Sequence, residues 1–385
     1  MSEKVPLVLR CHQKIFRAIG YCTLSLDVNQ KERLGRRLWS CTLMIAFNII
    51  TCVALFGNDD FLFNGDKFGY FNDSMKIIFG DMAATCAYLE AIINRASVEK
   101  FWEIYDKLQT NYSPKNIQKC SKQIWLQDIR KNRRFLIIFH TVVVTEIGVM
   151  VIFFSLRQMT RHLILFWSVF VPFIFVVHLR NMQFIFYIEL IRQELVKLKE
   201  DLGLMVDYSR FHAYGTGFQG FEIFLRSKLA EKQQIYQLIY EMFEHFQNSF
   251  GFSIIAVLLM IYVRVLVDSY FGYYSVYRGW NPIEIILLIP AFMQIPMFLI
   301  SSKACMDVVK FITLNLHNII TQFNNQNTSV SLQLQNFSLQ ILHQNICING
   351  VGIARMDGYM LTRAIGSITT YMIFFIQFMP KFTNN

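Results

Sequence analysis

Ionisable side chains lie inside long apolar stretches of this sequence. Among them are Asp81, Glu90, Glu146, Arg180, Arg264 and Asp268. A charge at the centre of a membrane-spanning helix costs about 2.5–3.5 kcal/mol, so such a residue faces a partner, a cavity or a pathway. Arg264 and Asp268 are four residues apart, which places them on one helix face as a pair. Glu90 and Arg180 lie at similar depths, and we interpret them as an ion pair that fixes helix packing.

Asp81 and Glu146 leave two interpretations open. Each is either half of an internal ion pair or part of a polar cavity that opens to the outside. Aromatic residues crowd the ends of the neighbouring apolar stretches, among them Trp167 and Phe170. Most of them fit an interfacial belt. Some could line a small-molecule pocket, which is typically apolar with a few convergent polar groups.

Other patterns that could support chemistry are weak. Gly215, Gly217 and Gly220 match the spacing of a dinucleotide-binding loop, but no strand precedes them, and that loop has meaning only between a strand and a helix. We interpret them as a flexible turn. The histidines and cysteines show no metal-ligand spacing, and no nucleophile or phosphate-loop motif is present. The sequence therefore predicts neither an enzyme nor a metal or cofactor site.

The elements that position these residues are predicted to be membrane helices. Hydrophobic residues make up 54% of the 385 and charged residues 17%, against about 25% charged in a typical soluble domain. Runs of roughly 20 apolar residues are long enough to cross a membrane as helix. Seven occur, at 38–57, 75–93, 135–156, 163–187, 250–270, 283–302 and 359–379. We therefore predict an all-α membrane protein with seven transmembrane helices.

The distribution of positive charge predicts the orientation. Of the Lys and Arg residues, 27 fall in the first 37 residues and in alternate connections, against five on the other side. Positive residues stay in the cytoplasm. We therefore expect a cytoplasmic N-terminus and an extracellular C-terminus, and we read the net charge of +10 as a topology signal rather than a sign of nucleic-acid binding.

The chain divides into four parts on this basis. Residues 1–37 form a cytoplasmic segment, and 38–302 hold helices one to six with cytoplasmic helical extensions at 94–134 and 188–249. Residues 303–350 form cytoplasmic helices, expected at 306–323 and 331–348, and 351–385 hold the seventh helix and a short extracellular tail. The 331–348 helix has few charges and an apolar stripe, so it needs a partner surface. That surface is either other helices of the same chain, a second subunit, or both.

The last apolar run carries a specific motif. Thr370, Tyr371, Gln377 and Phe378, with five apolar residues between the second and the third, resemble the TYhhhhhQF signature of insect gustatory receptors at all nine positions. Length, seven spans, topology and long inner helices resemble that family over the whole chain. Arg363, Gly366, Thr370 and Gln377 also form a narrow polar or small stripe on this helix.

The resemblance implies a ligand-gated, non-selective cation channel in the plasma membrane of a sensory neuron dendrite. Its subunits would form a homotetramer, or a heteromer with other gustatory receptor subunits, in which the inner helices form an anchor domain. The seventh helix would line the pore. The residues implied in the pore and gate are Gln377, Phe378, Thr370, Ile373 and Phe374. Thr370 and Tyr371 would hold this helix against its neighbours.

The ligand implied is a small-molecule tastant, and bitter or aversive compounds are the expected class. The pocket would lie in the outer half of each subunit. The resulting candidates for ligand binding are Asp81, Glu146, Trp167, Phe170, Phe292 and Gln294. Membrane lipid is the other expected partner.

Two alternatives stay open. A metabotropic seven-helix receptor needs an extracellular N-terminus, which the charge distribution contradicts. An odorant receptor of the same superfamily shares the architecture but generally lacks this C-terminal signature. A transporter is disfavoured because the sequence shows no internal repeat.

Overall fold

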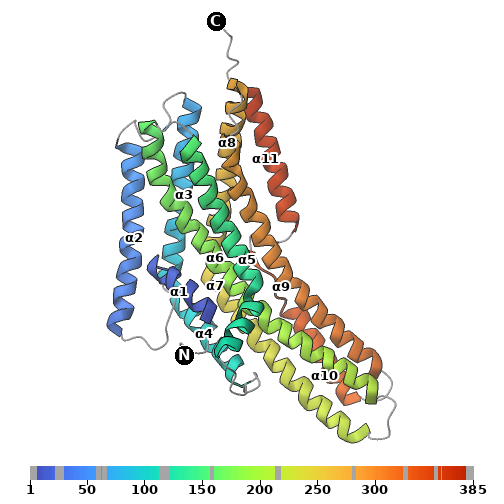
Figure 1. Cartoon of the computed structure of the whole chain (residues 1–385). Helices are drawn as coiled ribbons and strands as arrows, with labels where there is room; N and C mark the ends of the chain where they lie inside the picture. The colour runs from blue at the N-terminus through green and yellow to red at the C-terminus, as the bar shows by residue number, and fades with distance from the viewer. Residues whose placement is uncertain are drawn as a thin grey trace.

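The computed structural model shows a bundle of long helices that run roughly side by side along most of its length (Figure 1). The structure describes residues 7–21, 30–57, 62, 67–111, 121–156, 160–212, 218–279, 283–323, 328–350, 354–356 and 358–378. The helices are α1 (Leu7–Ala18), α2 (Gln30–Phe56), α3 (Lys67–Ile93), α4 (Arg95–Asn111), α5 (Ser121–Leu156), α6 (Arg161–His212), α7 (Phe218–Gly279), α8 (Ile283–Ile286), α9 (Leu288–Phe323), α10 (Thr328–His343) and α11 (Gly358–Phe378). Strands β1 (Asn349–Gly350) and β2 (Ala354–Arg355) pair antiparallel between α10 and α11.

Each of the seven predicted apolar runs coincides with helix, in α2, α3, α5, α6, α7, α8 with α9, and α11. Within the described residues, α2, α5, α6 and α7 are each long and apolar enough to cross a membrane. Helices α3 and α4 meet this test together as a pair bent by 64°, which makes five candidate spans. The prediction of a helical fold is therefore confirmed apart from the short β1–β2 hairpin, and several of its helices are apolar enough to span a membrane.

Two helices are far longer than a bilayer is thick. Helices α6 and α7 contain 52 and 62 residues. At 1.5 Å per residue they extend about 78 and 93 Å, against about 30 Å of hydrocarbon. The predicted continuation beyond the fourth apolar run is confirmed, since Ile191, Leu195 and Leu198 are all buried. Beyond the bundle, α6, α7 and α9 continue together with α10 as a second packed layer (Figure 1).

The predicted helix at 331–348 is partly wrong, because α10 ends at His343. Ile346, Cys347 and Ile348 are all buried although they are consecutive. Three consecutive residues cannot lie on one face of a helix, so their joint burial does not fit a helix packed by a single stripe. Gln247 on α7 donates a hydrogen bond of 2.7 Å to the Cys347 carbonyl, and strand β1 follows. The hairpin thus docks on α7 before the chain enters α11.

The apolar stripe of α10 packs within the chain. Leu334, Phe337 and Ile341 are buried, and Tyr236 of α7 lies edge-on to Phe337. Gln237 of α7 accepts hydrogen bonds from the side-chain amides of Gln340 and Gln344. The intramolecular partner predicted for this stripe is confirmed, and uncharged glutamines complete the contact.

The N-terminal helix α1 is tied to the bundle by polar contacts at its end. The Tyr21 hydroxyl donates a 2.6 Å hydrogen bond to the Val176 carbonyl of α6, and the Tyr88 hydroxyl of α3 donates to the Ile19 carbonyl. Trp39 of α2 donates to the Ala18 carbonyl. Phe16 and Tyr21 are fully buried. Residues 7–21 are therefore packed against the bundle.

Candidate functional site

A row of buried charges crosses the bundle between α3, α5 and α7. Arg264 of α7 donates to Glu146 Oε1 of α5 over 3.0 Å, and its Nε lies 3.5 Å from the Asp268 carboxylate one turn further along α7. Lys76 Nζ of α3 lies 2.5 Å from the other Asp268 oxygen. All four side chains are less than a tenth exposed. The predicted Arg264–Asp268 pair is confirmed, and it is the middle of a longer chain of charges.

Two polar residues extend this charged row toward α9. His178 Nε2 of α6 lies 3.7 Å from Glu146 Oε2, and the side-chain amide of Gln294 on α9 contacts the same ring nitrogen. Glu146 Oε2 and Gln294 Oε1 are buried and accept no hydrogen bond from the described residues. A buried acceptor without a donor costs free energy. Both oxygens remain without a donor among the described residues.

Aromatic rings close one side of the charged row. Trp167 and Phe170 of α6 are buried with their ring centroids 5.9 Å apart, and Phe166 stacks on Phe170. Phe153 of α5 lies 5.3 Å from Trp167. Lys76 Nζ lies 5.7 Å from the Phe170 centroid. The structure thus joins the predicted aromatic and polar candidates on α5 and α6 around one charged centre.

The other predicted ligand residues lie apart from it. Asp81 is partly buried on α3, and its Oδ1 has no hydrogen-bond partner among the described residues. Phe292 is 42% exposed on α9, two residues before Gln294. Sequence reasoning missed Lys76 and His178. Lys76 lies in the first turn of the predicted second span, where a charge is easily read as the membrane boundary.

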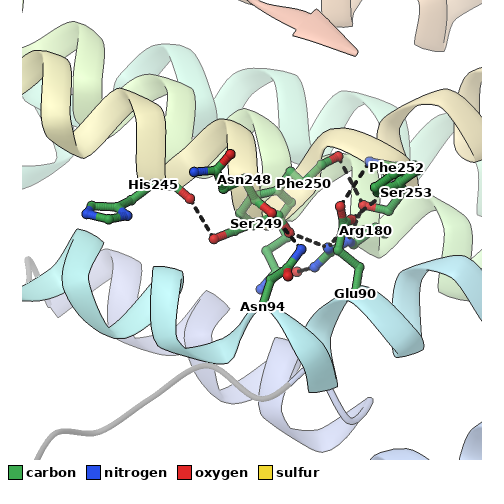
Figure 2. Close-up of polar contacts among 10 residues, drawn as sticks. Glu90, Asn94, Arg180, His245, Asn248, Ser249, Phe250, Phe252 and Ser253 are labelled. Atoms are coloured by element: carbon green, nitrogen blue, oxygen red, sulfur yellow. Dashed lines mark hydrogen bonds and ion pairs between the residues drawn. The ribbon is translucent and has the colours of Figure 1, made fainter. Parts of the chain in front are cut away.

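A second buried ion pair joins α3, α6 and α7 further along the bundle (Figure 2). Arg180 Nη2 lies 3.0 Å from Glu90 Oε2, which confirms the predicted pair. Arg180 also donates to the Ser253 hydroxyl and lies 4.2 Å from the Phe250 ring centroid. Both charged side chains are less than 5% exposed. The pair is satisfied on every side by protein groups, as a structural ion pair requires.

This pair also replaces contacts within α7. The backbone amides of Phe252 and Ser253 donate to the Glu90 carboxylate over 2.9 and 3.0 Å. In a regular helix these amides would pair with the carbonyls of residues 248 and 249. Asn94 donates to the first of those carbonyls and Arg180 to the second, over 2.6 and 3.1 Å. Glu90, Asn94 and Arg180 thus bind the backbone of α7 at residues 248–253, within one continuous helix.

Helix α11 carries the C-terminal motif along the side of the bundle, against α7 and α9. Ser367 of α11 hydrogen-bonds to Tyr262 of α7, and Ile368 is buried. The motif residues Thr370, Tyr371 and Gln377 are exposed in the single chain. Exposed apolar residues beside them are Ile365, Ile373, Phe374 and Ile376. The Phe378 side chain and the glycines at 215 and 217 lie outside the described residues.

Comparisons with known proteins are consistent with this architecture. A family model described as 7tm chemosensory receptor matches residues 9–382. A 49-residue segment, 13% of this chain, is 43% identical to the Drosophila melanogaster protein named putative gustatory receptor 2a, and it spans 11% of that protein. The fold is similar to that of the insect olfactory receptor OR5 from Machilis hrabei, solved in complex with eugenol. The TM-score is 0.64 at 14% identity, over 96% of this chain and 97% of that one. A second structure of OR5 gives a TM-score of 0.62 at 12% identity over the same shares.

Proposed function

This chain belongs to the 7tm chemosensory receptor family, and we propose that it is a gustatory receptor that works as a ligand-gated, non-selective cation channel. Its ligands would be bitter or aversive small molecules. Seven spans follow if α3, the first half of α9 and α11 cross the membrane with α2, α5, α6 and α7. The N-terminus would lie in the cytoplasm and the C-terminus outside, in the plasma membrane of a sensory neuron.

The observation that carries the channel proposal is the uncovered face of α11. Arg363, Thr370 and Gln377 lie on this face and are exposed in the single chain. Polar and charged groups in contact with lipid are costly, so they face other protein or a water-filled path. Four copies arranged with this face at the centre would satisfy the polar groups with water and ions. This supports Thr370, Ile373, Phe374, Gln377 and Phe378 as pore and gate residues.

The opposite end of the molecule supports assembly of several subunits. Leu332, Leu339 and Leu342 of α10 are 59, 51 and 72% exposed, and their spacing places them on one face. This face lies opposite the stripe that packs on α7. Exposed leucines on an inner helix that carries few charges favour a further partner surface. We propose that this surface joins the anchor domains of neighbouring subunits.

The charged row supports a ligand site in the outer half of each subunit. Glu146 and Gln294 offer free acceptors, and Trp167 and Phe170 offer apolar walls. Both Arg264 and Asp268 belong to α7, and Tyr262 links α7 to α11. Ligand binding would change the packing of α7 and α9 against α11 and move the gate. It can shift that equilibrium only by its different affinity for the two states.

The test is whole-cell current in cells that express this chain alone, with G-protein signalling blocked, under bitter compounds and sugars. A ligand-evoked cation current is expected to survive the block. Phe378→Ala is expected to raise the current without ligand, because it removes a bulky group from the gate. Tyr359→Ala, which changes an exposed aromatic at the other end of α11, serves as the control.

Each contrary result has a definite meaning. A current abolished by the block would establish a metabotropic receptor instead. An unchanged closed state in Phe378→Ala would overturn the gate assignment. If volatile odorants are added to the panel, a response confined to them would place the chain with odorant receptors.

A further inference from the structure

The ammonium group of Lys76 lies in a cage of three aromatic rings. Its Nζ is 5.9 Å from the centroid of Phe166, 5.7 Å from that of Phe170 and 5.4 Å from that of Phe271. Asp268 closes the cage with a carboxylate oxygen at 2.5 Å. The Lys76 side chain is 4% exposed. Aromatic rings around a carboxylate form the arrangement that recognises organic ammonium ions.

Lys76 is an unusual occupant for such a cage. A lysine on a span would normally extend its flexible stem so that the ammonium reaches the membrane surface. Lys76 is the tenth residue of α3, which begins at Lys67, so the helix end is within about 14 Å of it. Its ammonium nevertheless lies inward, in a protein-lined space. The rings and the carboxylate therefore hold the Lys76 ammonium inside the cage, although the side chain could also extend toward the membrane surface.

That alternative is Asp73. It lies three residues before Lys76 on α3, one turn nearer the helix end, and hence on the same face. Its carboxylate is 8% exposed and lies 3.9 Å from His162 at the start of α6. If Lys76 turned outward, its ammonium would exchange one carboxylate for another. Asp268 would keep Arg264 at 3.5 Å and would be free to bind a second cation.

We propose that Phe166, Phe170, Phe271 and Asp268 form a binding site for an organic ammonium ligand, and that Lys76 fills this site as a tethered occupant until the ligand displaces it. The proposal assigns a chemical class, amines and quaternary ammonium compounds, to the ligand of the proposed receptor. Its role in gating rests on the proposed function. The site itself is tested by binding, which needs no current.

The first experiment measures the reactivity of Lys76 in the purified full-length protein. Reductive methylation with formaldehyde and a borane reductant is followed residue by residue by mass spectrometry, with and without choline. A ligand that displaces Lys76 toward the surface is expected to speed its methylation. The neutral isostere 3,3-dimethylbutan-1-ol is expected to need about tenfold higher concentration for the same effect, because it lacks the cation. Lys310, which is 77% exposed, is the internal control.

The second experiment uses Lys76→Ala, which empties the cage but leaves Asp268 paired with Arg264. Choline is expected to raise the melting temperature of this variant at lower concentration than in the wild type, by about tenfold. The double variant Lys76→Ala/Asp268→Asn is expected to lose the shift. Equal effects of choline and its isostere, or unchanged Lys76 methylation in the wild type, would overturn the proposal. A choline effect on binding without any current would leave the site in place and overturn only its role in gating.

Discussion

The hydroxyl of Tyr262 on α7 lies 2.5 Å from the hydroxyl of Ser367 on α11, and this partly buried hydrogen bond joins the two helices. Tyr262 is two residues before Arg264, the central cation of the charged row. The same short segment of α7 therefore contacts both the proposed ligand site and the proposed pore helix. A movement of α7 at the charged row would act on α11 through this bond.

Loss of the Tyr262–Ser367 hydrogen bond is expected to lower the melting temperature slightly and to shift the ligand concentration needed for activation. Tyr262→Phe and Ser367→Ala each remove one partner of a hydrogen bond worth about 1 kcal/mol. Each is expected to lower the melting temperature and to shift the half-activating ligand concentration by about fivefold. The double variant should match the single ones, because the bond can be lost only once. Additive effects in this cycle would show that the two hydroxyls act independently.

The Arg180–Glu90 pair is expected to be essential for folding. Arg180→Met leaves a buried carboxylate without its counter-ion, and breaking such a pair costs about 3–5 kcal/mol. We expect little monodisperse protein on size-exclusion chromatography. The double variant Arg180→Met/Glu90→Gln removes both charges and should recover part of the yield.

The matched control for this pair is Lys310→Met, which breaks an exposed pair with Asp307 on α9. Exposed pairs contribute about 0–1 kcal/mol, so this variant should behave as the wild type. Normal yield of Arg180→Met would contradict a structural role for the pair.

The sequence predicted the helices well because a bilayer imposes a simple rule. Apolar runs of about 20 residues must be helical, since lipid offers no hydrogen-bond partners to an open backbone. Spacing within one helix also predicted the Arg264–Asp268 pair. The hairpin of β1 and β2 was beyond this reasoning, because strands of two residues show no periodicity. Its position depends on α7, which is about 100 residues earlier in the chain.

Contacts between helices could be predicted only where two opposite charges lie at the same depth in their membrane spans. Glu90 and Arg180 were matched in this way. Lys76 and Asp268 were not, although they lie 2.5 Å apart, because they are 192 residues apart in sequence. Their contact depends on how α3 and α7 are rotated about their axes. His178 was missed as well. A lone histidine in an apolar run forms no pattern with other polar residues, and its contact with Glu146 likewise depends on how the helices are rotated.

Assembly of subunits is expected to depend on the exposed face of α10. Leu342→Glu places a charge among Leu332, Leu339 and their counterparts in a neighbouring subunit. Burial of each leucine contributes about 1.5–3 kcal/mol, and a buried unpaired carboxylate is costly. Mass photometry of the purified variant should therefore show monomers in place of tetramers. Thr110→Glu adds the same charge at an exposed polar position of α4 and should leave assembly intact. Tetramers in both variants would exclude this face from the interface.

The close approach of β1 to α7 provides the last prediction. A Cβ at Gly350 would lie 2.7 Å from Ile255 Cγ1 and 3.2 Å from Met356 Cε. Contacts under 3.0 Å force a shift, and overpacking of this kind costs about 1–3 kcal/mol. Gly350→Ala is therefore expected to lower the melting temperature. Ile255→Ala in the same chain removes the obstructing atom and should restore part of the loss. Gly366→Ala is the control, because a Cβ there meets nothing within 4 Å. If Ile255→Ala lowered the melting temperature further instead, a clash with Ile255 would not be the cause of the first loss. The position of the hairpin would then not depend on the close approach of Gly350 to Ile255.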